Sequence, residues 1–194
     1  MSARRNTSST VEKAFAILDL VHASDDRGVS LADVAERLDV AKSTAHRYLV
    51  TLEELNVVRR NRQERFHIGV KLVELGSSFL ANNDLRSAAM PYLEALSRET
   101  QETIHLAVPS EECIIYIARI DGPHSVRVMT RIGARATMHS TALGKCMLAH
   151  MEPAAVSEIL SAELQQRTAR TITAPADLEQ EFAQIREQQY AIDE

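Results

Sequence analysis

A short run of polar and basic side chains, from Lys42 to Arg47, has the composition of a surface that contacts DNA. It reads Lys-Ser-Thr-Ala-His-Arg. In a helix with about 100° between successive residues, Ser43 and Arg47 share one face, with Thr44 and His46 beside them. Arginine pairs with guanine through two hydrogen bonds in the major groove, and hydroxyl groups bond to base edges there. Lys42 lies near the helix start, close to where a phosphate would lie, so the run predicts contacts with double-stranded DNA.

Two short amphipathic helices joined by a tight turn would position this run. The first is predicted from Leu31 to Leu38, with Ser30 as N-cap and Asp33 near the positive end of the helix. Asp39 occupies the turn, where a positive φ is needed and where Asp is tolerated better than most residues. The apolar face of the second helix consists of Ala45, Tyr48, Leu49 and Leu52. A unit of this kind places its second helix in the major groove.

A cationic hairpin follows the second helix. Val57–Arg60 and Arg65–Ile68 are strand candidates, and residues 61–64 form the turn between them. Its arginines are Arg59, Arg60, Arg62 and Arg65. A helix-turn-helix followed by such a hairpin is a winged helix, whose wing would contact the sugar-phosphate backbone or the minor groove. The alternatives are a helical hairpin with a solvated polar face and a hairpin whose arginines serve solubility.

The charge of the chain is divided unevenly along its length. The net charge is −5, but residues 1–70 hold 11 Lys and Arg against 10 Asp and Glu, whereas residues 71–194 hold 11 against 17. Local potential, rather than total charge, steers a protein to a polyanion. The distribution therefore favours one DNA-facing end, to which a flexible basic arm over residues 1–10, with Arg4 and Arg5, could add contacts.

The domain organisation follows from the order of the predicted elements. A winged helix-turn-helix domain is expected over residues 11–68, a linker helix over 69–83 and a second, α+β domain over 84–194. The second domain begins with a helix over 85–100 that Pro91 should kink or restart. Strands are predicted at 103–108, 113–120 and 126–130, in an antiparallel sheet. One helix is then predicted to end at His150, a second to begin at Pro153 and a third to begin at Pro175.

Composition excludes several other classes of protein. The chain has no run of eighteen apolar residues, so no transmembrane span is predicted, and its first residues lack the apolar core of a signal peptide. Cys113 and Cys146 have no partner at metal-binding spacing, so we expect reduced thiols and a cytoplasmic location. No motif indicates a metal or a cofactor.

Six segments in order resemble the IclR-type transcriptional regulators, and the resemblance extends over nearly the whole chain. The segments are Leu31–Leu38, Lys42–Arg47, Thr51–Leu55, Phe66–Gly69, Arg131–Arg135 with His139–Lys145, and Tyr190–Glu194. The resemblance implies a winged helix-turn-helix, a connecting helix and an effector domain of GAF-like fold. It also implies homodimers or homotetramers that bind operator DNA and respond to small organic effectors.

The resemblance also implies part of an effector site. Ala142 and Leu143 match positions that approach the ligand, and Val128 and Ala136 match apolar wall positions. Small residues at a helix start would admit an anion close to backbone N–H groups, although an ordinary loop packed against a sheet is the alternative. The family sequence continues beyond Glu194 into further strands, so we expect a fragment or a natural truncation and an incomplete effector domain.

Two other classes of function remain as alternatives. His139, Ser140 and Cys146 lie close in sequence, so a hydrolase with a thiol or serine nucleophile is an alternative, but no further residue completes a catalytic set. Cys146 falls on the apolar side of its helix, which favours a structural cysteine and predicts that the protein is not an enzyme. The other alternative is a winged-helix module that binds a protein instead of DNA.

Overall fold

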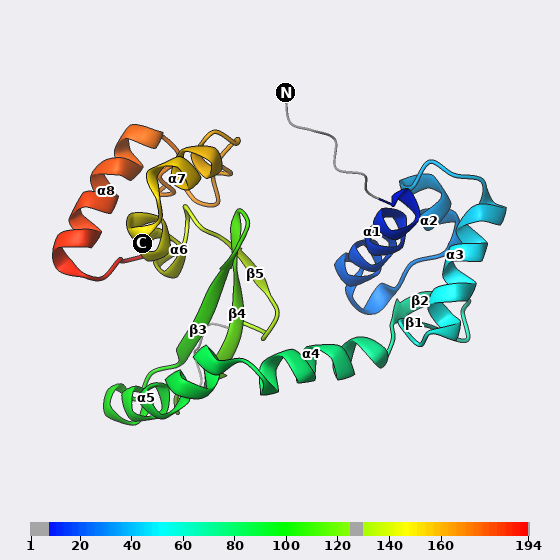
Figure 1. Cartoon of the computed structure of the whole chain (residues 1–194), viewed down its shortest axis with the longest axis horizontal. Helices are drawn as coiled ribbons and strands as arrows, with labels where there is room; N and C mark the ends of the chain where they lie inside the picture. Colours follow the sequence, from blue (N-terminus) through cyan, green and yellow to red (C-terminus); the bar gives the residue numbers. More distant parts are fainter. Residues whose placement is uncertain (1–7, 125–129, 194) are drawn as a thin grey trace. The chain divides into compact units, whose positions relative to one another are not determined.

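The chain folds into two compact units, one of residues 1–82 and one of 83–194 (Figure 1). The computed structural model describes residues 8–124 and 130–193. The basic arm expected over 1–10 therefore falls largely outside the described residues, as does most of the strand predicted at 126–130. The mixture of helices with small antiparallel sheets confirms the predicted α+β class.

The first unit is a winged helix-turn-helix. Its elements are α1 (Ser9–Ala23), η1 (Asp25–Arg27), α2 (Leu31–Arg37), α3 (Lys42–Glu54), β1 (Val58–Arg60), β2 (Phe66–Ile68) and α4 (Lys71–Ala81). β1 and β2 pair antiparallel, with Arg59 opposite His67. The core consists of Ile17, Val21, Val29, Val34, Ala35, Ala45, Leu49, Leu52, Val58 and Phe66. The hairpin thus packs on the same core as the helices.

The buried stripe of α1 differs from the predicted one. The apolar spacing over residues 11–23 predicts an inward stripe of Val11, Ala14, Phe15, Leu18 and Val21. Val11 and Phe15 are instead 54% and 63% exposed, whereas Ile17 and Val21 are buried. The core-facing stripe runs through Ala14, Ile17, Leu18 and Val21, which are spaced at three and four residues. Ala14 already packs on the core, and Phe15 lies about 100° further around the helix, so Phe15 faces away from the core.

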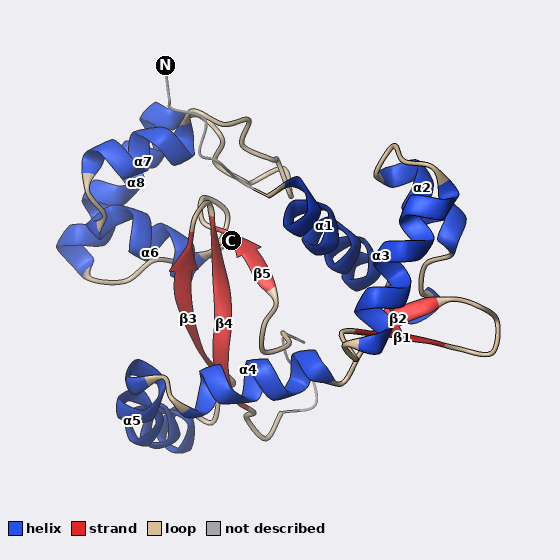
Figure 2. Ribbon diagram, turned by 45° about the vertical axis from the view of Figure 1, so that its right-hand side comes forward, coloured by secondary structure: helices blue, strands red, loops and turns tan. Residues whose placement is uncertain are grey.

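The second unit contains a three-stranded antiparallel sheet of order β3-β4-β5, drawn in red in Figure 2. Its elements are α5 (Asp84–Thr100), β3 (Ile104–Ser110), β4 (Cys113–Ile120), β5 (Arg135–Thr137), α6 (Ala142–His150), α7 (Pro153–Leu160) and α8 (Pro175–Gln188). α5 is one helix that continues through Pro91, so the predicted restart does not occur. β5 was not predicted, because three residues carry too little periodicity to be recognised.

Helices α6 and α8 pack together beside the sheet and close the core of this unit. The largest fully buried side chains there include Ile114, Met138, Leu148, Leu178 and Ile185. Pairing between β3 and β4 is irregular between Leu106 and Ala107. Across both units, none of the described helices has the length and apolar character needed to span a bilayer.

Candidate DNA-binding surface and ligand cavity

The second helix of the helix-turn-helix, α3, presents the predicted polar run to solvent. Lys42, Ser43, His46 and Arg47 are exposed and Thr44 is half-buried. The opposite face of α3 is fixed by Ala45, Leu49 and Leu52, all buried in the core. The first turn begins after Ala41, which offers no side-chain cap. Backbone N–H groups of this turn are therefore available to a phosphate beside Lys42.

The turn before α3 has the predicted geometry. Ser30 and Asp33 form a capping box, in which the Asp33 N–H donates to Ser30 Oγ and the Ser30 N–H donates to Asp33 Oδ2 at 2.8 Å. Asp39 has a φ of 50°, as its place in the turn requires. These contacts fix the start of α2 and the turn that follows it, and the shared apolar core packs α3 against α2.

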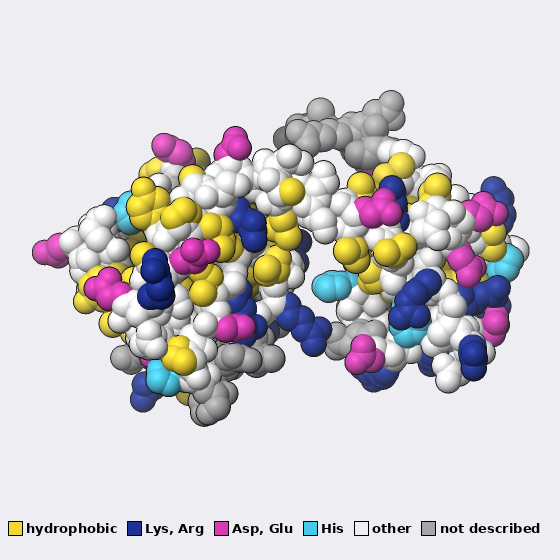
Figure 3. Space-filling model, turned by 90° about the horizontal axis from the view of Figure 1, so that it is seen from below, with side chains coloured by type: hydrophobic (Ala, Val, Ile, Leu, Met, Phe, Trp, Pro, Cys, Tyr) yellow, Lys and Arg dark blue, Asp and Glu magenta, His cyan; other side chains and the backbone are white. Residues whose placement is uncertain are grey.

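The structure brings part of the wing next to the start of α3. Lys42 and His46 line the same surface recess, of about 580 Å³, as Arg60 and Arg65. In Figure 3, Lys and Arg side chains lie at several points over the winged unit, with acidic side chains between them. The recess thus combines cations of the recognition helix and of the wing with the Glu64 carboxylate.

The four wing arginines differ in their contacts. Arg65 donates to the Gly28 carbonyl at 2.9 Å and lies 3.6 Å from the Asp33 carboxylate. Arg60 pairs with Glu64 at 2.7 Å and also approaches Glu53. Within residues 8–124 and 130–193, Arg59 and Arg62 form no hydrogen bond or ion pair, and both are exposed. Two arginines of the wing therefore bond to other residues of the chain, and the other two are exposed without such a contact in the described part of the chain.

The ionised state of Asp33 links the cap of α2 to the wing. The hydrogen bond that the Ser30 backbone N–H donates to the Asp33 carboxylate lowers the pKa of Asp33. The Ser30 side chain and the positive charge of Arg65 lower this pKa further. The carboxylate therefore stays ionised where it can attract Arg65. One side chain thus caps α2 and helps to hold the hairpin beside it.

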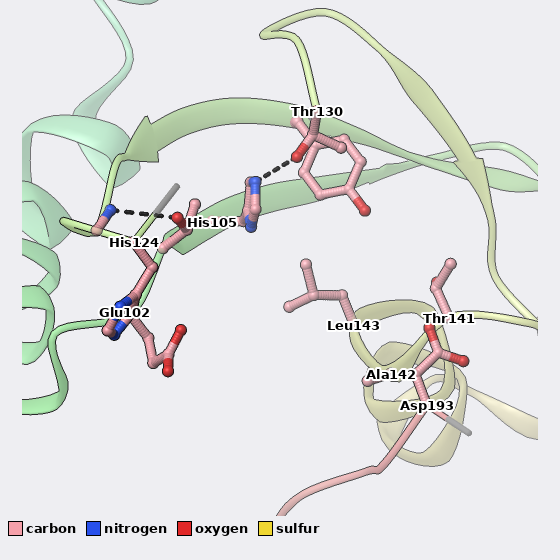
Figure 4. Close-up of a pocket in the computed structure, with 11 residues that line it drawn as sticks. Glu102, His105, His124, Thr130, Thr141, Ala142, Leu143 and Asp193 are labelled. Carbon is pink, nitrogen blue, oxygen red and sulfur yellow. Dashed lines mark hydrogen bonds between the residues drawn. The ribbon is translucent and has the colours of Figure 1, made fainter. Parts of the chain in front are cut away.

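The second unit contains a cavity of about 520 Å³ that reaches from the strands to the first turn of α6 (Figure 4). Ala142 and Leu143 line it from α6, and His105 and Thr130 lie on the opposite side. The full lining is Glu102, Thr103, His105, Tyr116, Gly122, His124, Thr130, Thr141, Ala142, Leu143 and Asp193. Two apolar side chains therefore face a wall of hydrogen-bonding groups, so the lining has more polar side chains than is usual for small-molecule sites.

The polar wall of the cavity is organised around His105. Its imidazole hydrogen-bonds to the Thr130 hydroxyl and packs edge-on against Tyr116, with 5.4 Å between ring centroids. Burial lowers the pKa of His105, and the neighbouring Arg119 lowers it further, with Asp121 opposing. Burial and then the Asp193 charge raise the pKa of Tyr116. Both rings are thus uncharged near neutral pH and offer neutral hydrogen-bonding groups to a ligand.

Not all predicted effector residues meet at this cavity. Ala136 pairs with Ile114 in the sheet and packs against the core, away from the cavity lining. Val128 lies outside the described residues. His105, Tyr116 and Thr130 were missed, although Thr103 and His105 alternate along the predicted strand. That alternation was the available signal that two polar side chains share one face of the sheet.

The residues of the hydrolase alternative are engaged elsewhere. His139 is buried and its Nε2 lies 3.0 Å from the Gln165 carbonyl oxygen. Cys146 packs against the core of the second unit. No hydrogen bond joins these two side chains in the part of the chain that the structure describes. Their surroundings are those of structural residues.

A winged helix-turn-helix followed by an α+β unit with its own cavity defines a class of two-domain transcriptional regulators. Residues 10–62 match the IclR helix-turn-helix domain, and residues 77–194 match the Bacterial transcriptional regulator IclR C-terminal domain. The chain belongs to the IclR family of transcriptional regulators.

Individual relatives support this membership. The chain is 37% identical over 187 residues to the HTH-type transcriptional regulator KdgR of Escherichia coli, with 95% of this chain and 70% of that protein covered. KdgR of Dickeya chrysanthemi is 36% identical, and the chain spans 61% of its length. Among solved structures, the Thermotoga maritima IclR superposes with a TM-score of 0.65 at 35% identity, with 95% of this chain and 74% of that chain covered.

Proposed function

We propose that this protein binds a specific operator through α3 and the wing, with binding controlled by a small organic molecule in the cavity of the second unit. The observation that supports operator binding most directly is the exposed set on α3, above all Ser43, His46 and Arg47. Lys42, Arg59 and Arg62 are proposed to contact phosphates. The protein is proposed to act in the cytoplasm as a homodimer or homotetramer, and not as an enzyme.

The proposed effector is a small organic acid or related metabolite. The α6 helix begins at the cavity, and the Thr141 hydroxyl accepts from the Gly144 N–H, which leaves the first two N–H groups of the helix without an intrahelical partner. A carboxylate can bind there while His105, Tyr116 and Thr130 bond to its polar substituents. Ala142 and Leu143 are proposed to contact the carbon skeleton of the ligand, with Val128 as a further apolar position.

Operator binding can be tested with duplexes selected from a random pool on the purified protein. Arg47→Ala should weaken binding to the selected duplex by about 1–3 kcal/mol if Arg47 pairs with a guanine. The matched control is Arg98→Ala, which removes an exposed arginine from α5 in the other unit. If the parent protein, Arg47→Ala and Arg98→Ala had equal affinities in a gel-shift titration, Arg47 would not contact the operator. Binding to no duplex at any salt concentration would favour the protein-binding alternative.

Effector binding can be tested by a thermal-shift screen of small organic acids. A ligand that binds the native state raises its stability by mass action. Ala142→Trp should fill the cavity and abolish the shift produced by any acid found, with operator binding unchanged. Ala154→Trp, on an exposed position of α7, is the control for adding an indole to this unit. Native affinity in the Ala142 variant would place the effector elsewhere.

A further inference from the structure

The turn of the wing is organised by one side chain, Asn61. Its backbone N–H donates to the Arg65 carbonyl at 2.9 Å, and its own carbonyl accepts from the Glu64 N–H at 3.1 Å. Its side-chain oxygen, Oδ1, accepts from the N–H groups of Gln63 and Arg65, at 2.9 and 3.0 Å. Two backbone donors therefore fix which end of the amide is oxygen. The Nδ2 group must point in the other direction.

The amide nitrogen of Asn61 meets the imidazole of His67. Asn61 Nδ2 lies 2.9 Å from His67 Nε2. Because an amide NH2 group only donates, Nε2 must accept, which requires a neutral imidazole with its proton on Nδ1. The ring cannot move aside freely, since it packs directly on Gly28: a Cβ at that position would lie 2.7 Å from His67 Cε1 and Nε2.

We infer that His67 is a positioning residue for DNA binding, whose neutral imidazole holds the wing turn through Asn61 and whose protonation releases it. A proton on Nε2 would place two donors against each other. Rotating the Asn61 amide to present its oxygen would break both bonds to the backbone of the turn. The consequence for DNA rests on the proposed function, because the turn carries Arg62 and follows Arg59.

Among the charged groups near His67 that the structure describes, none forms a hydrogen bond that would stabilise a protonated ring. Arg59 lies opposite in the β-ladder, and Arg65 precedes β2. The elements packed on β2 carry further titratable or charged residues: Glu12, Lys13, Asp19 and His22 in α1, Asp26 and Arg27 before Gly28, and Arg60 in β1. None of these groups hydrogen-bonds to His67 within the described ranges, 8–124 and 130–193. Protonation therefore costs the Asn61 bond and gains no carboxylate contact.

The first test uses the whole protein without DNA. Imidazole ¹⁵N shifts at pH 7.5 should report His67 as the Nδ1–H tautomer, with Nε2 unprotonated. A second set of spectra is recorded at pH 5.5. The Gln63 and Arg65 amide resonances should then shift together with the His67 ring and lose protection from exchange. The inference would be overturned by an Nε2–H tautomer. It would also be overturned if the Gln63 and Arg65 amide resonances stayed unchanged when the His67 ring is protonated.

Three variants separate this role from a general effect of acid. Asn61→Asp keeps both backbone bonds and offers its second oxygen to an imidazole N–H, so acid should no longer release the turn. His67→Gln supplies an uncharged acceptor, so the turn should stay ordered at both pH values. The control is His22→Gln, on an exposed position of α1, which should behave as the parent protein does. Acid sensitivity that persists in the Asn61 and His67 variants would contradict the inference.

The second test measures the salt dependence of operator binding. If acid releases the wing and both projecting arginines leave the backbone, the slope of log K against log salt should shrink by about 1.8 between pH 7.5 and 5.5. His67→Gln retains His46 and should show no such change. Release of the turn by NMR with an unchanged slope would mean that the wing does not contact DNA. That outcome would contradict the proposed function of the wing and the DNA-binding part of the inference, and it would leave only the role of His67 in holding the wing turn.

Discussion

At the scale of single residues, the wing shows that one residue type can serve two purposes within seven positions. Arg65 bonds to the Gly28 carbonyl and attracts Asp33, so its charge holds the hairpin against α2. Arg62 projects from the turn and is exposed. The sequence assigned all four arginines to phosphate contact. The contacts of Arg65 instead support a structural role, which separates stability from DNA affinity.

Two matched substitutions test this division. Arg62→Gln should reduce the salt slope of operator binding by about 0.9, the contribution of one phosphate contact, and leave the unfolding temperature unchanged. Arg65→Gln should lower the stability of the winged unit by about 1 kcal/mol, because it loses a charged hydrogen bond that is partly exposed. Calorimetry and salt titrations on both variants give the comparison. If instead Arg65→Gln reduced the salt slope and Arg62→Gln lowered the unfolding temperature, Arg65 would be the phosphate contact and Arg62 the structural residue.

At the scale of elements, the first turn of α6 is held close to the segment that precedes it. The Thr141 hydroxyl donates to the Thr137 carbonyl at 2.8 Å and accepts from the Gly144 N–H. Gly144 is buried against Met138: a Cβ there would lie 2.3 Å from the Met138 carbonyl oxygen. The close approach sets where Ala142 and Leu143 meet the cavity. Glycine is therefore required by packing at this position.

Two glycine-to-alanine substitutions should have opposite effects on stability. Gly144→Ala should cost about 1–3 kcal/mol, because the backbone of 138 must move to admit a methyl group. Gly76→Ala, in the middle of α4, meets nothing within 4 Å in the single chain and should stabilise the helix of the monomer by about 0.5–1 kcal/mol. Thermal unfolding of both variants measures the difference. A neutral Gly144→Ala would show that this turn can relax without loss.

At the scale of the whole molecule, α4 exposes apolar side chains that one chain leaves uncovered. Leu75 and Phe79 are 56% and 55% exposed, and they share one face of the helix with the half-buried Leu72. A two-fold protein suits an operator with two half-sites, because each copy then meets one major groove. We therefore expect this stripe to pack against a second copy in a homodimer.

Phe79→Glu should shift the dimer toward monomer and weaken binding to a palindromic operator more than binding to a single half-site. A buried, unpaired carboxylate at a helix interface is strongly unfavourable. Ser77→Glu adds the same charge to an exposed position of α4 outside this stripe and is the control. Sedimentation at micromolar concentration measures the mass of each protein. A dimer that tolerates Phe79→Glu would place the interface on another surface.

The sequence by itself determined the elements whose signals are local. Ser30 and Asp33 predicted the start of α2, and Asp39 predicted the turn before α3, because caps and turns depend on residues within a few positions of each other. The strand at 113–120 was predicted with its observed bounds from a continuous β-branched run. Periodicity likewise placed the exposed and buried faces of α3 correctly.

Only the tertiary structure decided which distant residues meet. The cavity joins His105 on β3 to Leu143 on α6, and the anchoring bond of Arg65 reaches back to Gly28. The tertiary structure also leaves Phe15 exposed, although the position of Phe15 along α1 fits an inward-facing apolar stripe. Helical and strand periods say which residues share a face, but they contain no information about the neighbour that covers that face. That neighbour is fixed by packing between segments far apart in the chain, and so is the difference between a structural arginine and a free one.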